Sequence, residues 1–333
     1  MTETPTEPTP LTAKSPEDVL AAVPVVLGFE PTDSVVMLTF AGGENFSARV
    51  NLPPNEGIDE VVELLLDPAR RHCVDSVLFV LYTDDVFLAR RLRGRLVRAF
   101  DRARILVVET IRTDGMRWYS PGRPGVPASG VPYDCSGHRF RAQSVLEGRV
   151  IHGSREELAG MLMPTAGAAA VERALGAATP YVVAEVGPVV AAALERGRFP
   201  DEELAALVLA LPDLDARDAA WKGFDRPSAE RQVDLWTDAV QRCPEALVAG
   251  PAAVLALAAW LAGHGALAWC AVDRSQEVEP GNSLARLVGD LLSDAVPPSW
   301  WDRWSRDRER EELAWEIADL EDRLDLEVGE DGG

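Results

Sequence analysis

The chain has 333 residues, of which 47% are hydrophobic and 26% are charged, values typical of a globular protein with about two domains. Its net charge of −21 argues against generic attraction to nucleic acid or to an anionic membrane surface. The four cysteines have no CxxC spacing, so the sequence indicates neither a disulfide framework nor a zinc ribbon.

The first half predicts an α/β domain over residues 14–160, preceded by a disordered tail over 1–13 that is rich in Thr, Glu and Pro. Apolar runs that alternate with helical patterns predict a mixed, mostly parallel sheet that is covered by helices and begins with an N-terminal hairpin. The predicted elements are a helix over 15–27, hairpin strands over 34–40 and 46–52, a helix over 58–69, a strand over 76–82, a helix over 86–103 and a strand over 105–111.

Residues 114–135 interleave glycine with proline, which predicts one long exposed loop. Capping-box residues Ser154-Arg155-Glu156-Glu157 then restart helical structure.

The second half predicts an all-α domain over 165–325, because its apolar segments are rich in Ala and Leu at helical spacing. The uncharged stretch 251–272 is broken by Gly263-His264-Gly265, which favours two short buried helices over a membrane span. These helices, at 252–260 and 266–278, resemble one tetratricopeptide-like pair. A last helix from about Trp300 to Leu324 is expected either to dock on the same chain or to form a homodimer contact, and residues 326–333 form an acidic tail.

Several short motifs appear in a fixed order along most of the chain. They are Ser15-Pro16, Leu27-Gly28-Phe29, Ser34-Val35-Val36, Arg49-Val50-Asn51-Leu52-Pro53, Ser154-Arg155-Glu156-Glu157-Leu158, Gly263-His264-Gly265-Ala266-Leu267-Ala268 and Pro297-Pro298. With these motifs the chain resembles the actinobacterial domain of unknown function family 4192. The resemblance implies an intracellular protein without an assigned activity. Members of that family carry a cysteine-rich patch after the tryptophan that corresponds to Trp118, whereas this chain keeps only Cys135 there.

A basic stretch stands out from the acidic background. Residues 70–155 contain 16 Arg and 8 Asp or Glu, a balance of +8, so the rest of the chain must carry −29. Arginines with aromatic rings beside them are typical of single-stranded nucleic-acid grooves, where charge binds phosphates and rings stack on bases. A solvated helix face, or one that docks on the acidic second half, explains the same pattern. The candidate anion-binding or nucleic-acid-binding residues are Arg91, Arg95, Arg98, Arg102, Arg117, Trp118, Tyr119, Arg139 and Arg141.

Carboxylates follow the predicted strands. Asp84 and Asp85 come after the strand at 76–82, while Glu109 and Asp114 lie at or beyond the end of the next one. Since ligands of open α/β sheets bind at the carboxyl ends of strands, these four are the catalytic candidates for a Mg²⁺-dependent phosphoryl-transfer or nuclease activity. The alternative is that Asp84 or Asp85 caps the helix that follows.

Cys135, His138 and His152 are candidate metal ligands, although an ordinary loop histidine explains the same residues and three ligands fall short of a structural zinc set. The sequence contains no GxGxxG, GxxxxGK[ST], HExxH or GxSxG motif.

These observations favour a cytoplasmic, non-enzymatic interaction or adaptor protein without a cofactor. Its basic face would lie on the α/β domain, and its helical domain would bind a protein partner. The Mg²⁺-dependent enzyme and a nucleic-acid-binding protein that uses the Arg-rich helix are the two alternatives. No membrane association is expected.

Overall fold

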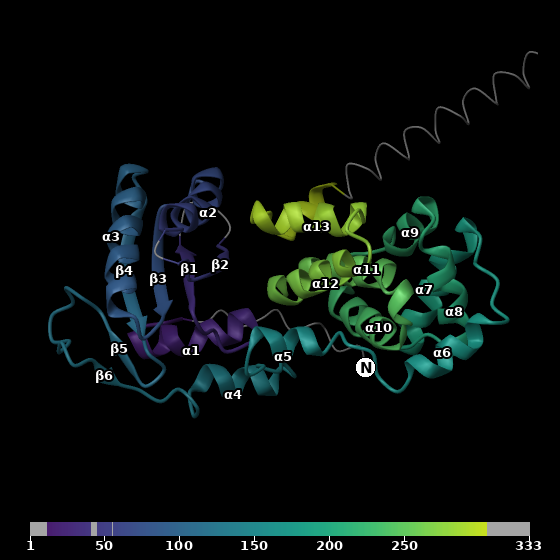
Figure 1. The fold of residues 1–333 in the computed structure, drawn as a ribbon, viewed down its shortest axis with the longest axis horizontal. Coiled ribbons are helices and arrows are strands. Elements are labelled where there is room, and N and C mark those ends of the chain that lie inside the picture. Colours follow the sequence, from purple (N-terminus) through teal and green to yellow (C-terminus); the bar gives the residue numbers. More distant parts are fainter. Residues whose placement is uncertain (1–11, 41–44, 55, 305–333) are drawn as a thin grey trace, which may run out of the picture.

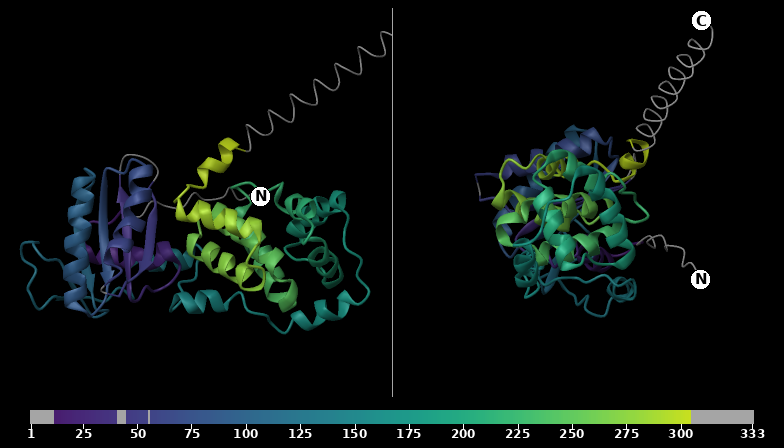
Figure 2. Two further views of the ribbon diagram at one scale, coloured as in Figure 1. Left: turned by 45° about the horizontal axis from the view of Figure 1, so that its top comes forward. Right: turned by 90° about the vertical axis from the view of Figure 1, so that its right-hand side faces the viewer.

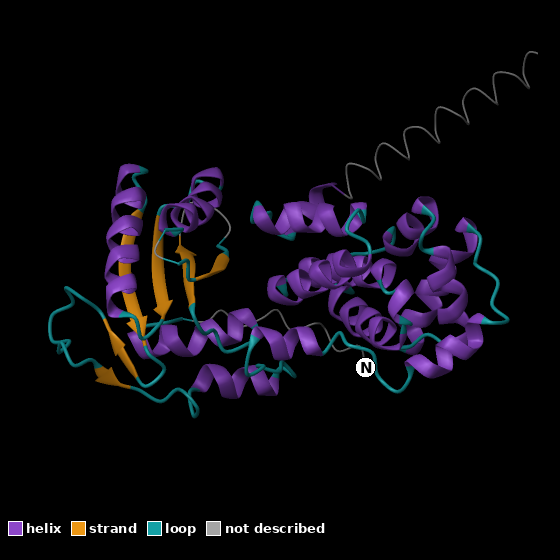
Figure 3. Cartoon of the chain, in the orientation of Figure 1, coloured by secondary structure: helices purple, strands orange, loops and turns teal. Residues whose placement is uncertain are grey.

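The computed structural model describes residues 12–40, 45–54 and 56–304, which form an α/β half followed by a helical half (Figure 1). All the strands among the described residues lie in the first half, as Figure 3 shows in orange. The elements of this half are α1 (Pro16–Leu27), β1 (Ser34–Phe40), β2 (Ser47–Asn51), α2 (Ile58–Arg71), β3 (Ser76–Tyr82), α3 (Val86–Arg102), β4 (Leu106–Thr113), β5 (Arg117–Tyr119), β6 (Val131–Pro132) and α4 (Arg139–Leu146).

The six strands form one mixed sheet in the order β2-β1-β3-β4-β5-β6. The predicted hairpin is present, with Ser34 opposite Asn51 and Leu38 opposite Ser47. The prediction of a mostly parallel sheet is wrong, because β3 and β4 are the one parallel pair among these strands and the other pairs are antiparallel. Strand β1 is apolar on both faces, so its sequence is equally compatible with either direction.

The glycine- and proline-rich segment is not one loop, contrary to the prediction. Arg117–Tyr119 (β5) pairs with Arg112 and Thr113 of β4, and Val131–Pro132 (β6) pairs with β5. Gly130 has φ +75°, and a Cβ there would lie 2.5 Å from the Tyr119 ring, so only glycine fits against that ring. The segment therefore extends the sheet beyond β4.

Helices cover both faces of the sheet. Helices α2 and α3 pack on one face, where Val35, Phe79 and Leu96 are fully buried. Helix α1 packs on the other face over Val36 and Val80, and α4 packs against α1 (Figure 1). The three-layer arrangement leaves the outer side of α3 facing solvent.

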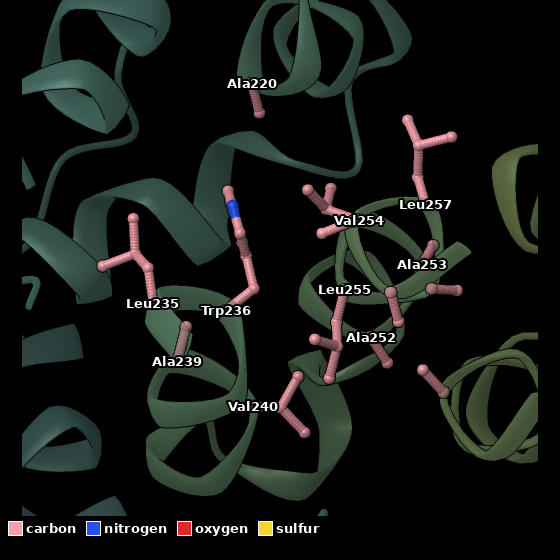
Figure 4. Close-up of a cluster of buried hydrophobic side chains, with 14 of the residues drawn as sticks. Ala220, Leu235, Trp236, Ala239, Val240, Ala252, Ala253, Val254, Leu255 and Leu257 are labelled. Carbon is pink, nitrogen blue, oxygen red and sulfur yellow. The ribbon is translucent and has the colours of Figure 1, made fainter. Parts of the chain in front are cut away.

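The helical half contains α5 to α13, whose small residues permit close packing. Its elements are α5 (Arg155–Gly160), α6 (Ala168–Leu175), α7 (Val183–Arg196), α8 (Asp201–Ala210), α9 (Leu214–Trp221), α10 (Ala229–Arg242), the 3₁₀ helix η1 (Glu245–Leu247), α11 (Ala249–Leu261), α12 (Gly265–Val278) and α13 (Ser283–Ser293). Figure 4 shows Trp236 and Val240 of α10 beside Val254 and Leu255 of α11. At Gly250 a Cβ would lie 2.9 Å from the Leu211 Cβ, so the α11 backbone approaches its neighbour closely.

The uncharged stretch forms two buried helices, as predicted. Helices α11 and α12 pack against each other and are joined by residues 262–264. Within the described part of the chain, no helix has the length and apolar character needed to cross a membrane. The resemblance of the α11 and α12 pair to a tetratricopeptide repeat stays a prediction.

A tryptophan cluster closes the described end of the helical half. Trp301 is 6% exposed, its Nε1 donates to the Phe224 carbonyl at 3.0 Å, and its ring contacts those of Trp221, Trp260 and Trp304. The rings join α9 and α11 to the segment after α13, which is the role of an inter-helix contact. Most of the predicted last helix, its homodimer contact and the acidic tail lie outside the described residues.

The two halves meet along a seam beside the end of α1, and Figure 2 shows them side by side along the long axis. Phe29 forms a parallel bridge with His152, and the His152 N–H donates to the Gly28 carbonyl at 2.9 Å. Phe29 and Leu158 of α5 belong to the buried core of the helical half. Arg155 pairs with Asp273 of α12 at 2.7 Å.

Candidate anion-binding site

Helix α3 is held by its cap and by one apolar face. The Asp85 carboxylate accepts hydrogen bonds from the backbone N–H groups of Phe87 and Leu88, both at 2.9 Å, so Asp85 is the N-cap of this helix. Leu92, Leu96 and Phe100 are fully buried against the sheet. Because these residues fix the rotation of α3, the arginines between them must project away from the core.

One stripe of side chains runs along the outer side of α3. Successive members are four, four, three and four residues apart, which places them on one face of a helix. We call this set the α3 stripe; it consists of Phe87, Arg91, Arg95, Arg98 and Arg102. All five are exposed. The stripe therefore brings together four of the nine residues predicted to bind an anion.

Three arginines of the α3 stripe line a pocket of about 500 Å³ between α3 and the start of α2. Its lining residues are Arg91, Arg95, Arg98, Glu56, Ile58 and Asp59. Helix α2 begins at the N-cap Gly57 without a side-chain capping bond, so the positive end of its dipole lies beside these arginines. The pocket therefore combines guanidinium groups with a helix N-terminus.

Asp59 occupies part of this pocket. Arg95 Nε donates to one Asp59 carboxylate oxygen at 2.7 Å, and its NH2 donates to the other. These bonds raise the pKa of Arg95 above its ordinary value. Within the described part of the chain, the side chains of Arg98 and Arg102 make no hydrogen bond or ion pair. The cations of the stripe thus differ in availability, and Asp59 competes with any anion for Arg95.

The remaining predicted arginines serve local structure. Arg117 NH1 donates to the carbonyls of Ser129 and Gly130, at 3.3 and 3.0 Å. Arg139 donates to the Thr12 carbonyl at 3.0 Å, and Arg141 pairs with Glu30. The Arg117 contacts hold β5 to the residues before β6, and the other two hold α4 to the chain on either side of α1; none of these residues lines the pocket.

The predicted aromatic platform is not available for base stacking. Trp118 is 5% exposed, and its Nε1 donates to Glu17 at 2.9 Å. The Tyr119 ring lies 3.7 Å beneath the Arg112 guanidinium, and its hydroxyl donates to Asp114. Burial of Trp118 on the α1 side of the sheet contradicts its predicted role as a stacking ring.

The predicted carboxylates have separate partners. Glu109 lies within β4, opposite Leu78, and accepts from Ser120 and Arg123, both at 2.7 Å. Asp114 accepts from two backbone N–H groups of the following turn, at 3.0 and 2.8 Å. Although burial alone raises the pKa of Asp114, its hydrogen bonds from the Tyr119 hydroxyl and these N–H groups lower it overall. Asp84 is exposed beside the capping Asp85.

The candidate metal ligands are also engaged in structural contacts. Cys135 Sγ lies 3.6 Å from the Glu17 carbonyl, and burial raises the pKa of this thiol. His138 Nε2 lies 3.0 Å from Asp18, while His152 takes part in the backbone bridge to Phe29. Within the described part of the chain, no group of three or more His, Cys, Asp or Glu side chains could hold a metal ion.

Two parts of the site were missed by the sequence reasoning. The acidic wall of the pocket comes from α2, 36 residues before Arg95. Phe87 reads as part of the apolar run Val86-Phe87-Leu88, although its four-residue spacing to Arg91 was a usable signal that it lies on the arginine face.

A mixed sheet with helices on both faces, joined through α1 and α5 to a helical half, defines a two-part α/β and helical protein. The chain belongs to the family described as a domain of unknown function, DUF4192, which matches residues 16–299. No curated protein and no solved structure matches the chain.

Proposed function

We propose that the protein is a non-enzymatic interaction protein that binds a polyanionic partner through the α3 stripe. The observation that carries this proposal is the pocket in which Arg91, Arg95 and Arg98 meet the uncapped start of α2. Arginine guanidinium groups and helix N-termini are both favourable neighbours of phosphate and carboxylate groups.

The arrangement of charge supports a long ligand over a small anion. From Arg91 to Arg102 the stripe extends about 16 Å along the helix axis, at about 1.5 Å per residue. Arg102 lies beyond the residues that line the pocket, so one small anion in the pocket cannot use it. A chain of negative charges can contact the pocket and Arg102 together.

The catalytic alternative gains no comparable support. Of its four carboxylates, Asp85 caps α3, Glu109 binds Ser120 and Arg123, and Asp114 holds the turn before β5. The Mg²⁺-dependent activity stays a prediction, as does the protein-binding role of the helical half.

The test is binding of a labelled polyanion to the full-length chain, followed by fluorescence anisotropy. A suitable probe is an oligonucleotide backbone of about 15 abasic units, since single-strand sites span about 4 to 16 nucleotides. Four arginine contacts predict a slope of about −3 for log affinity against log salt concentration, which is a loss of roughly 50-fold between about 50 and about 200 mM salt.

The matched variants are Arg98→Glu/Arg102→Glu and Arg173→Glu/Arg286→Glu. Both pairs change net charge equally, but the second lies on α6 and α13 of the helical half. We expect the stripe variant to weaken binding by more than about tenfold and the control to change it less than about twofold. Absence of binding at about 50 mM salt, or equal losses in the two variants, would overturn the proposal.

A further inference from the structure

An aromatic side chain stands at the head of the α3 stripe. Phe87 is 83% exposed, although phenylalanine is among the residue types most often buried. Its exposure follows from the rotation of α3 about its axis, because Leu92 and Leu96 face the sheet and Asp85 caps the first turn. Val86 beside it is 56% exposed, which makes the start of α3 apolar as well as open.

Phe87 is continuous with the arginines of the stripe. It precedes Arg91 by one turn, about 6 Å along the helix axis, and Arg102 by about 22 Å. A ligand that lies along the stripe therefore meets an apolar aromatic ring at one end and guanidinium groups along the rest of its length.

An aromatic ring followed by guanidinium groups favours some classes of polyanion over others. An acidic peptide supplies charge without regularly offering flat rings, and a duplex keeps the faces of its bases inside the stack. A single strand offers a phosphate at each nucleotide and bases whose faces are free to stack on an aromatic side chain.

We infer that the ligand of the α3 stripe is a single-stranded nucleic acid, with its phosphates on the arginines and one unstacked base against Phe87. This inference rests on the proposed function. The residues outside 70–155 carry an excess of acidic side chains and repel a strand, so binding away from the basic stretch is disfavoured and binding stays sensitive to salt.

The experiment measures binding of labelled probes to the full-length protein. The single-strand and abasic probes have equal length and charge, and the duplex has about half as many base pairs, so that it carries a similar number of phosphates. Oligodeoxythymidine and oligouridine are the single-strand arms, the abasic backbone is the arm without bases, and a duplex is the arm with covered bases. We expect both single strands to bind about 5- to 150-fold more tightly than the abasic probe, the range that stacking of one base produces.

Phe87→Ala should remove this advantage while leaving binding of the abasic probe unchanged. Phe87→Trp, which keeps a flat ring, should retain it. The matched control is Leu146→Ala, since Leu146 is 89% exposed at the end of α4 and lies outside the stripe. The midpoint of urea unfolding should stay unchanged in all three variants, because each side chain is on the surface.

The experiment distinguishes failure of the base-stacking inference from failure of the proposed function. Equal affinity for the base-bearing and abasic probes, with no effect of Phe87→Ala, would overturn base stacking and leave polyanion binding in place. Preference for the duplex over both single strands would also overturn it. Failure of all probes to bind at about 50 mM salt would overturn the proposed function itself.

Discussion

Three arginines of the helical half, Arg217, Arg242 and Arg274, are buried and paired, whereas the arginines of the α3 stripe are exposed. The Arg242 side chain is 2% exposed and donates to the Phe199 carbonyl at 2.9 Å and to Asp238 at 2.5 Å, with Asp201 as a further partner. Arg274 is 6% exposed and binds Glu245. Arg98, by contrast, is exposed at the rim of a pocket.

Arginine therefore has two roles in this chain, a structural role where it is buried and a proposed binding role where it is exposed. A buried guanidinium has lost its hydration and needs charged partners within the protein, so its carboxylate partners are part of the fold. An exposed guanidinium keeps its hydration until a ligand replaces it. What separates these two groups of arginines is burial and the number of their partners within the protein, which net charge does not reveal.

The largest effect expected from this contrast is on stability. Arg242→Ala should lower the free energy of unfolding by about 3 kcal/mol, because it removes a buried partner of the Asp201 and Asp238 carboxylates and opens a cavity. Arg98→Ala should change it by less than about 0.5 kcal/mol. Urea unfolding of both variants measures the difference. A similar loss in the two would mean that burial does not separate the two classes of arginine.

A smaller effect is expected at a carboxylate that serves structure in the α/β half. Asp18 accepts from the Lys14 and Ser15 backbone N–H groups at 2.7 and 3.2 Å and completes the capping box of α1. Asp18→Asn should cost about 1 kcal/mol near neutral pH, as measured by urea unfolding.

This loss should depend on pH. The hydrogen bond from Lys14 is the main cause that holds the pKa of Asp18 below its ordinary value of 3.8, against the opposing effect of burial. A carboxyl with a lowered folded-state pKa stabilises the protein above its unfolded pKa and loses this contribution as pH falls through the folded value. The difference between the variant and the native chain should therefore shrink below about pH 4. A constant difference would show that the charge of Asp18 is not responsible.

The smallest effect is expected at the acidic wall of the pocket. Asp59→Asn should strengthen binding of the abasic probe about two- to fivefold at low salt, since it frees Arg95 and removes a repelling charge. Asp67→Asn is the control, with the same change of charge two turns further along α2. Anisotropy titrations compare them. Weaker binding by Asp59→Asn would mean that Asp59 orients Arg95 for the ligand instead of competing with it.

Much of the α/β half could be predicted from local sequence. The helix expected over 15–27 is present as Pro16–Leu27, and the helix expected over 86–103 is present as Val86–Arg102. Strand direction could not be predicted, because an apolar run such as β1 satisfies a parallel or an antiparallel neighbour equally well. β5 was missed since its three residues lie among glycines and prolines and gain their pairing from β4.

Part of the candidate site can be predicted from the sequence, namely the part that lies on a single helix. The spacing of Arg91, Arg95 and Arg98 on one helix is visible in the sequence. Their shared pocket is not, because Asp59 reaches it from another helix. The aromatic partners were placed at Trp118 and Tyr119 from sequence proximity to Arg117, whereas burial and hydrogen bonding decide which rings stay open.

The seam has a consequence for how the protein is made. Phe29, 2% exposed, lies within the first tenth of the chain but is buried among residues of the helical half, including Leu158 and Leu162. Synthesis proceeds from the N-terminus, so the strands of the sheet emerge long before the side chains that enclose Phe29. Packing at the end of α1 is therefore completed only after the helices of the second half have been made. Until then the nascent chain carries an exposed aromatic residue that a chaperone or another nascent chain can bind.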